Sequence, residues 1–321
     1  MDFVLNAAAA LTEWGIHGER AVRRVTGGEQ RAQRRRREEA AKRPEGVVGT
    51  DTTNGPVVTW HEGGAGDPVV LINGYGASGL LWPSGWLADL EERHRVIRID
   101  NRMTGWSRRA PIPFTVADMA DDVAAVLRQL GLSGGRVLGM SLGGAIAQEL
   151  AMRHPQLVEH LVLVSTIPPS PASALASSRH VLHTDVDLMA SMLIHGGMAS
   201  REARQGRAGR QLLRFAGPEL VGDPEVEAEL GAQMLRRPTP PRLLLEQSRA
   251  IAAWRGPNRL RGISAPSTVV HGSADPLVLP RNAHTLADLI PGARLVELPG
   301  VGHLVPWEAP GELARILEEP T

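Results

Sequence analysis

Short apolar runs alternate with helical apolar stripes along most of the 321 residues. Runs such as LVLVS at 161–165 are typical of strands that are buried on both faces. The clearest stripe predicts a helix over 115–130, where Thr115 and Asp118 form a capping-box pattern. Predicted strands cover 68–72, 95–99, 136–138, 160–165, 267–272 and 293–298, and further helices cover 80–90, 282–290 and 311–319. This alternation predicts an α/β fold, in which helices cover both faces of a parallel sheet.

The alternation is interrupted once, between residues 167 and 266. This stretch has several helical patches but no convincing strand, so it predicts a helical insertion in the sheet domain. We expect it to form a cap, or lid, over the carboxyl edge of the sheet, where open α/β sheets bind ligands. The predicted sheet domain comprises 46–166 and 267–321. A hairpin around Asn54–Gly55 is predicted near its start, within 47–62.

Residues 1–45 precede the sheet domain and predict a separate helical extension. Apolar residues recur there at helical spacing, and the basic run RAQRRRREEAAKR follows them. The run fits a solvated helix face of mixed charge. A membrane or nucleic-acid patch is the alternative, which Glu38 and Glu39 weaken. The apolar face must be covered by the body of the protein or by a second copy in a homodimer.

Composition narrows the classes of partner. Lys+Arg and Asp+Glu are equal at 35 each, so nothing indicates nucleic acid as a partner. The absence of cysteine excludes disulfides, thiolate metal sites and a cysteine nucleophile. No window approaches the roughly 20 apolar residues of a membrane span, and the N-terminus lacks the basic leader of a secretory signal. We therefore expect a cytoplasmic protein with no membrane span.

One serine lies in an unusually tight setting. Ser141 stands between Gly139 and Gly143 in the stretch GMSLG, where a predicted strand turns into a helix. Flanking glycines allow strand and helix to approach closely, and the serine would occupy a strained turn with its hydroxyl exposed. The stretch alone fits either a packing turn or a nucleophile. A nucleophile would need a base, and an acid that orients the base.

An acid and a base follow in the order that such a serine needs. Asp275 comes just after one predicted strand, and His303 comes just after the last one. Both lie at carboxyl ends of strands, on the same edge as Ser141, so the three are predicted to form a catalytic triad. Asp275 also suits a simple helix cap. His271 precedes the acid and is expected to be a buried histidine at a strand end.

An oxyanion formed at this serine needs two hydrogen-bond donors. We expect one to be the backbone N–H of Leu142, at the start of the helix that follows. The other is expected from the loop after the strand 68–72, where Gly74 and Gly76 flank Tyr75 and permit close backbone approach. The predicted second donor is the Tyr75 amide.

Together these motifs resemble those of the α/β-hydrolase superfamily, in its serine hydrolase branch with a helical cap. The resemblance covers about residues 47–320. It rests on Asn73–Gly76, Asp100–Ser107, the turn at Ser141, His271–Pro276 and Gly302–His303. It implies a mostly parallel eight-stranded sheet and chemistry through an acyl-enzyme.

Two positions depart from the family pattern. The oxyanion loop usually begins His-Gly, and Asn73 stands at its first position here. Met103 replaces the first glycine of the family motif D-x-R-G-x-G-x-S. Neither position carries a catalytic group, but both suggest an unusual pocket rim. Asp100 and Arg102, in the same motif, are expected to brace the loop rather than react.

The motifs indicate a serine hydrolase that cleaves a carboxylic ester, lactone or thioester of a largely apolar organic acid, a small-molecule substrate. No cofactor is expected, and no metal, because His180 and His183 in the predicted cap have no apparent third ligand. The alternative is a related reaction on the same fold: acyl transfer, carbon–carbon cleavage, or a lyase or cyclase step in a biosynthetic pathway. A binding protein without activity is disfavoured, because such proteins typically lose a member of the triad.

Overall fold

The structure is a computed structural model that describes residues 48–50, 58–107, 112–170, 201–236, 238–239 and 241–319. The predicted N-terminal extension over 1–45, with its proposed role in a homodimer, lies outside the described residues. So do His180 and His183.

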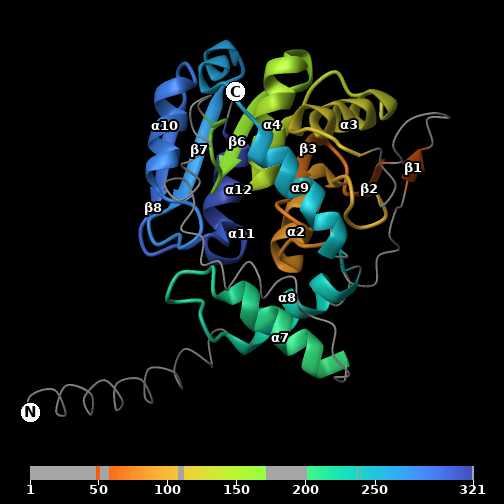
Figure 1. Cartoon of the computed structure of the whole chain (residues 1–321), viewed down its shortest axis with the longest axis vertical. Helices are drawn as coiled ribbons and strands as arrows, with labels where there is room; N and C mark the ends of the chain where they lie inside the picture. The colour runs from red at the N-terminus through yellow and green to blue at the C-terminus, as the bar shows by residue number, and fades with distance from the viewer. Residues whose placement is uncertain are drawn as a thin grey trace, which may run out of the picture.

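Eight strands form one sheet in the order β1-β2-β4-β3-β5-β6-β7-β8. In Figure 1 they run from β8 on the left to β1 on the right. The first two pair antiparallel, β2 pairs antiparallel with β4, and all the other neighbours are parallel. The strands are β1 Val48–Thr50, β2 Val58–Gly63, β3 Asp67–Ile72, β4 His94–Asp100, β5 Arg136–Met140, β6 His160–Val164, β7 Ser267–Gly272 and β8 Arg294–Leu298. The predicted fold class is confirmed. Strands β1 and β2 pair antiparallel within the predicted hairpin 47–62, whereas its turn at Asn54–Gly55 lies outside the described residues.

Helices cover both faces of the sheet, as the apolar strands require. One face carries α3 (Val116–Gln129), α4 (Leu142–Arg153) and α10 (Arg281–Leu289). The other carries α2 (Ser84–Glu91), α11 (Val305–Glu308) and α12 (Pro310–Glu318). Successive residues of β3 point to opposite faces: Val70 and Ile72 join the first hydrophobic cluster, whereas Val69 and Leu71 join the second.

Helix starts match the sequence signals in one case and differ in another. The capping box before α3 is present, because Thr115 Oγ1 accepts from Asp118 N at 3.1 Å and Thr115 N donates to Asp118 Oδ2 at 2.7 Å. Helix α2 was predicted from Leu80, but it begins at Ser84 with Pro83 as its N-cap. A proline disfavours the helical conformation in the residue before it, so the helix starts only after Pro83.

The segment between β6 and β7, residues 167–266, is here called the cap segment. Its described part contains α7 (Arg201–Leu213), α8 (Pro224–Arg236), α9 (Pro241–Ala253) and the 3₁₀ helix η3 (Pro257–Gly262). No strand occurs among its described residues, which form only an isolated bridge between Ser170 and Arg255. Figure 1 shows α7 and α8 at the lower end of the molecule and α9 crossing the middle of the view. The exact domain boundaries stay a prediction.

The cap segment is tied to the sheet domain where the chain returns to it. Glu149, in α4, is fully buried and accepts two hydrogen bonds from the Arg259 guanidinium, at 2.6 and 2.9 Å. Trp254 Nε1 donates to the same carboxylate at 2.8 Å. A buried carboxylate needs such partners, so these contacts fix the return of the cap segment against α4.

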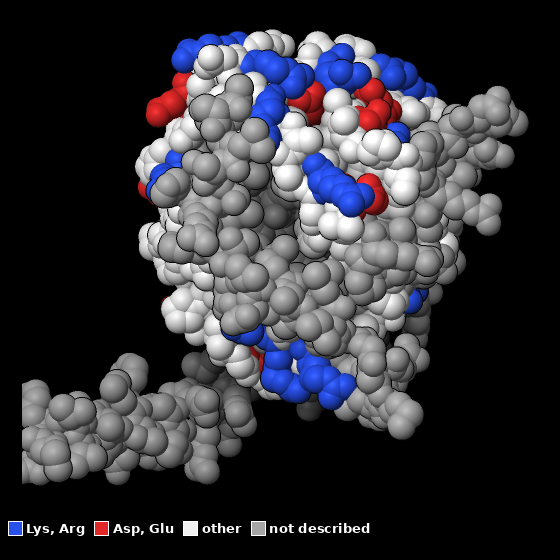
Figure 2. Space-filling view, in the orientation of Figure 1, with Lys and Arg blue, Asp and Glu red and all other residues white. Residues whose placement is uncertain are grey.

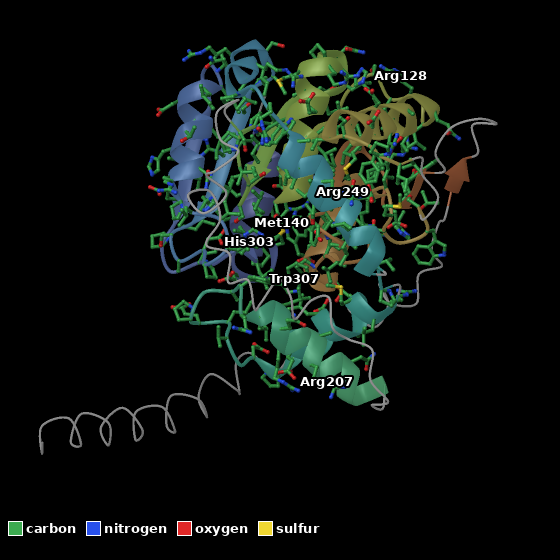
Figure 3. All side chains as sticks on the ribbon, in the orientation of Figure 1. Arg128, Met140, Arg207, Arg249, His303 and Trp307 are labelled. Carbon is green, nitrogen blue, oxygen red and sulfur yellow. The ribbon has the colours of Figure 1, made fainter. Side chains whose placement is uncertain are left out.

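The visible surface carries charges of both signs. In Figure 2, Lys and Arg gather along the upper edge beside Asp and Glu. A second basic group lies at the lower end, where Figure 3 labels Arg207 on α7. Of the helices in the described part of the chain, none combines the length and the apolar character that a bilayer crossing requires.

Candidate active site

Ser141 occupies the sharp turn from β5 into α4. Its backbone has φ 55° and ψ −120°, a conformation that costs a non-glycine residue about 1–3 kcal/mol. Two contacts hold it there: Ser141 N donates to Val164 O at 2.9 Å, and Thr166 Oγ1 donates to Ser141 O at 2.6 Å. Such strain persists only where the surroundings enforce it, and these two contacts help to hold Ser141 in the turn.

Glycines around Ser141 allow the close approach that the sequence predicted. A Cβ on Gly143 would lie 1.9 Å from Ile72 O, and one on Gly139 would lie 2.3 Å from Gly143 O. A Cβ on Gly144 would lie 2.5 Å from the side chain of Thr166. The strand, the turn and the helix therefore pack more closely than any side chain would allow.

Asp275 and His303 are joined by a hydrogen bond of 2.8 Å between Asp275 Oδ2 and His303 Nδ1. The Asp275 side chain is fully buried, and its Oδ1 accepts from the amides of Leu277 and Val278. It therefore caps its own turn and orients the histidine at once. Burial acts to raise the pKa of Asp275, but the charge and hydrogen bond of His303, with the Val278 amide, outweigh it and lower the pKa overall. The carboxylate is ionised at neutral pH.

The loop that carries His303 is anchored by Glu308 and by the cap segment. Glu308 accepts backbone hydrogen bonds from Gly217 at 2.7 Å, Gly302 at 2.8 Å and Leu304 at 3.1 Å. Burial raises the pKa of this carboxyl despite the three donors. The backbone oxygen of Phe215, which follows α7, accepts a hydrogen bond from His303 N at 2.7 Å. The Phe215 ring packs edge-on against the imidazole, with 6.3 Å between the ring centroids. The histidine is thus held from the cap side as well as from β8.

His271 is the buried strand-end histidine that the sequence predicted. It is 1% exposed, and its Nε2 lies 2.9 Å from Val278 O, which can only accept a hydrogen bond. Burial lowers its pKa, so it is neutral at pH 7. Its Nε2 also lies 3.5 Å from Asp275 Oδ2, behind the carboxylate that holds His303.

The strand order brings Ser141 and the acid–base pair to one edge of the sheet. Ser141 N is bonded to the last residue of β6, and Ser165 N to Val270 O of β7, so the three strands end level. Figure 3 labels Met140, the residue before Ser141, and His303 near the centre of the view. The hydrogen bonds of the described residues do not include one between Ser141 Oγ and His303 Nε2. Such bonds are often long in enzymes without substrate.

The loop after β3 lies directly against Ser141. A Cβ on Gly74 would lie 3.1 Å from Ser141 Cβ. Asn73 shapes the loop from within: its Oδ1 accepts from Gly74 N at 2.7 Å, and its Nδ2 donates to Leu81 O at 2.6 Å. Asn73 and Met103 are each only 3% exposed, and the expectation of an unusual pocket rim stays a prediction. Asn73 is an internal brace of the loop.

Met103 and its neighbours form a second internal support. Met103 has φ 74°, a left-handed conformation that explains why glycine suits this position. Asp100 accepts from the amides of Gly79 and Trp106, at 2.8 and 2.9 Å. Arg102 forms a buried ion pair with Asp122, at 2.5 Å. Asp100 and Arg102 therefore brace the loops, as the sequence indicated.

The backbone amides around Tyr75 differ in their hydrogen bonding. Gly74 N and Gly76 N are taken, by Asn73 Oδ1 and by Gln247 Oε1 at 2.9 Å. The amides of Tyr75 and Leu142 have no hydrogen-bond partner among the described residues. The Tyr75 hydroxyl is used elsewhere, since it donates to Leu244 O at 3.0 Å. Burial raises the pKa of this phenol.

A sequence profile of the α/β hydrolase fold matches residues 67–310. The chain belongs to the α/β-hydrolase family. Among its relatives, the candidate non-heme bromoperoxidase BpoC of Mycobacterium tuberculosis is 31% identical over 255 residues, which cover 79% of this chain and 93% of BpoC. The rhodomycin D methylesterase DauP of Streptomyces sp. (strain C5) is 30% identical over 304 residues, which cover 83% of this chain and 95% of DauP.

Solved structures agree with this assignment to the α/β-hydrolase family. The esterase RhEst1 from Rhodococcus sp. ECU1013 is 25% identical, covers 84% of this chain and 98% of its own, and superposes with a TM-score of 0.66. The family match and the esterase and hydrolase relatives indicate that this chain is an enzyme.

Sequence reasoning missed three residues that hold the site: Thr166, Gln247 and Glu308. Gln247 had a weak signal, because it interrupts the apolar side of α9 that Leu244 and Ile251 continue. Thr166 and Glu308 gave none, since their partners are backbone groups, which no side-chain pattern marks.

Proposed function

We propose that this α/β-hydrolase is a serine hydrolase that cleaves carboxylic esters or lactones through an acyl-enzyme. The observation that carries the proposal is the buried Asp275–His303 pair, joined at 2.8 Å on the sheet edge where Ser141 occupies its strained turn. A nucleophile, a base and an orienting acid in this order are the parts that acyl transfer needs.

Each residue has one task in this mechanism. His303 Nε2 takes the proton of Ser141 Oγ as the oxygen attacks the substrate carbonyl, and Asp275 holds the opposite ring nitrogen and stabilises the imidazolium. The amides of Tyr75 and Leu142 donate to the oxyanion of the tetrahedral intermediate. The intermediate collapses, and the departing alcohol takes the proton from His303.

The second half of the cycle repeats these steps with water. His303 removes a proton from a water molecule, which attacks the acyl-enzyme carbonyl, and the same two amides stabilise the new oxyanion. Collapse returns the proton to Ser141 Oγ and releases the carboxylic acid. Atoms balance as one ester plus one water giving one acid and one alcohol.

The substrate class is drawn from the surroundings of His303 and from the relatives. The cap side next to His303 is apolar, with Phe215 against the ring and Leu212 and Leu213 buried nearby. This favours an apolar acyl group. Names of relatives as methylesterase and esterase support an oxygen ester over a thioester.

Ser141→Ala tests the nucleophile. We expect turnover of p-nitrophenyl esters to fall to the background rate, and a fluorophosphonate probe to stop labelling the peptide that contains residue 141. Ser165→Ala is the matched control, because Ser165 also directly follows a strand and has a positive φ, at 46°, and its buried hydroxyl has no partner among the described residues. Full activity in Ser141→Ala would overturn the proposal.

A second experiment separates hydrolysis from related chemistry. In water enriched in heavy oxygen, hydrolysis places one label in the released acid. Acyl transfer to another acceptor, or a lyase or cyclase step, would leave the product unlabelled and would favour the alternative reaction on this fold.

A further inference from the structure

Cap helix α9 holds the oxyanion loop by several polar contacts. Gln247 is fully buried, and its two amide atoms bridge two loops: Oε1 accepts from Gly76 N at 2.9 Å, and Nε2 donates to Arg102 O at 2.8 Å. Thr239, just before α9, donates from its hydroxyl to Gly76 O at 2.9 Å. A residue 171 positions away in sequence therefore fixes the peptide next to the proposed oxyanion donor.

The loop that these contacts hold is a tight turn. Ala77 N donates to Gly74 O at 3.2 Å, and Gly76 has φ 69° whereas Tyr75 does not have a positive φ. This combination defines a type II turn. Rotation of the Tyr75–Gly76 peptide would convert it to type I and would turn Gly76 N away from Gln247 Oε1. The hydrogen bond from Gly76 N therefore favours the type II form.

We propose that Gln247 is a positioning residue for the oxyanion hole, and that seating of α9 organises the Tyr75 donor. The inference rests on the proposed serine hydrolase function. Gln247 holds the peptide that follows Tyr75, and Asn73 holds the amide that precedes it. The Tyr75 amide lies between these two fixed peptides, on a loop that packs against Ser141, since a Cβ on Gly74 would lie 3.1 Å from Ser141 Cβ.

Two further contacts make the same connection through side chains. The Tyr75 hydroxyl lies 3.0 Å from Leu244 O and 2.8 Å from Ser248 Oγ, one helical turn along the same face of α9. A Cβ on Gly76 would lie 2.7 Å from Leu244 Cδ2, so the helix presses directly on the turn. Any displacement of α9 from the sheet domain loosens the donor, because the loop and the helix share these bonds.

Gln247→Met is the test, since methionine keeps the length of the side chain but loses both hydrogen bonds. We expect kcat for p-nitrophenyl esters to fall by about 10- to 100-fold with KM changed less than threefold, because a misaimed donor fails mainly in the transition state. The inhibition constant of a trifluoromethyl ketone, which forms an oxyanion adduct with the serine, should rise in proportion to the loss in kcat/KM.

Gln233→Met is the matched control. Gln233 is a glutamine of α8 that also joins the cap to the sheet domain, by donating to Trp82 O at 2.9 Å, but it does not touch the oxyanion loop. We expect its kcat and its ketone affinity to equal those of the wild type. If Gln247→Met does not fold, Thr239→Val removes the hydroxyl bond to Gly76 O with little change in shape and should lower kcat in the same direction.

The outcomes separate this inference from the proposed function. Loss of kcat with parallel loss of ketone affinity supports the positioning role. Equal kcat in wild type and Gln247→Met, while Ser141→Ala is inactive, overturns the inference and leaves the serine mechanism intact. An active Ser141→Ala would overturn both. A fall in kcat with unchanged ketone affinity would also overturn it, because the donor would then be unaffected.

Discussion

The close packing at Gly143 makes a sharp prediction for Gly143→Ala. A Cβ there would lie 1.9 Å from Ile72 O and 2.7 Å from Asn73 O, and Cβ atoms are essentially never found closer than 3.0 Å to such groups. The first turn of α4 must therefore move by about 1 Å from β3, or the strand must give way. Both obstructing atoms are backbone, so no side chain can rotate to relieve the clash.

The expected cost follows from this displacement. Overpacking in a well-packed core costs about 1–3 kcal/mol, and we expect Gly143→Ala to lie near the upper end because backbone must shift. The same movement carries the Leu142 amide and Ser141 out of line with the oxyanion loop. A misplacement of about 1 Å can reduce catalysis by about 100-fold, and we expect a loss of that order in kcat/KM.

Urea unfolding, monitored by circular dichroism, measures the loss in free energy of unfolding. Turnover of p-nitrophenyl esters measures the loss in kcat/KM. Gly311→Ala is the control, because Gly311 lies in α12 and a Cβ there meets nothing within 4 Å. It should keep full activity and gain up to about 1 kcal/mol in free energy of unfolding. A Gly143→Ala protein that matches the wild type in both assays would refute the described packing of the turn.

Three other substitutions test separate parts of the structure. Asp275→Asn should lower kcat by about 10³- to 10⁴-fold. Folding lowers the pKa of Asp275, so its contribution to stability is complete above the ordinary value of 3.8 and is lost as the pH falls through the lower folded value. Urea unfolding at successive pH values should therefore show that the stability advantage of the wild type over Asp275→Asn shrinks in acid. Glu308→Gln turns an amide N–H toward backbone donors and should cost about 1–3 kcal/mol in free energy of unfolding, together with a fall in kcat. Thr115→Ala removes the cap of α3 and should cost about 1 kcal/mol at unchanged kcat, measured in the same two assays.

Local patterns predicted the sheet well because a strand that is buried on both faces forms a short run of apolar residues in the sequence. The run Ser267–Gly272 was predicted with the bounds that the structure shows, and the last strand and helix differ by one residue at one or both ends. Strand ends then placed Ser141, Asp275 and His303 on one edge, since parallel strands share their carboxyl edge. Their catalytic roles stay a prediction until they are tested by mutation.

Contacts between distant segments could not be predicted in the same way. Asn73 looked like a change at an exposed rim, but its amide is buried and braces the loop from within. Gln247 binds a backbone N–H that is 171 residues away in sequence, and nothing in the pattern of α9 indicates this partner. Glu308 accepts hydrogen bonds from three backbone amides, one in the cap segment and two in the loop that carries His303. Such residues depend on tertiary packing, which periodicity does not encode.

Tyr75 is the only tyrosine among the 321 residues, and its hydroxyl lies on the cap helix α9. A single label therefore reports on the junction between the cap and the oxyanion loop. Protein grown with 3-fluorotyrosine would give one fluorine resonance that needs no assignment, whereas the seven tryptophans would blur any fluorescence signal. The position of this one resonance would report on the contact between the Tyr75 hydroxyl and α9.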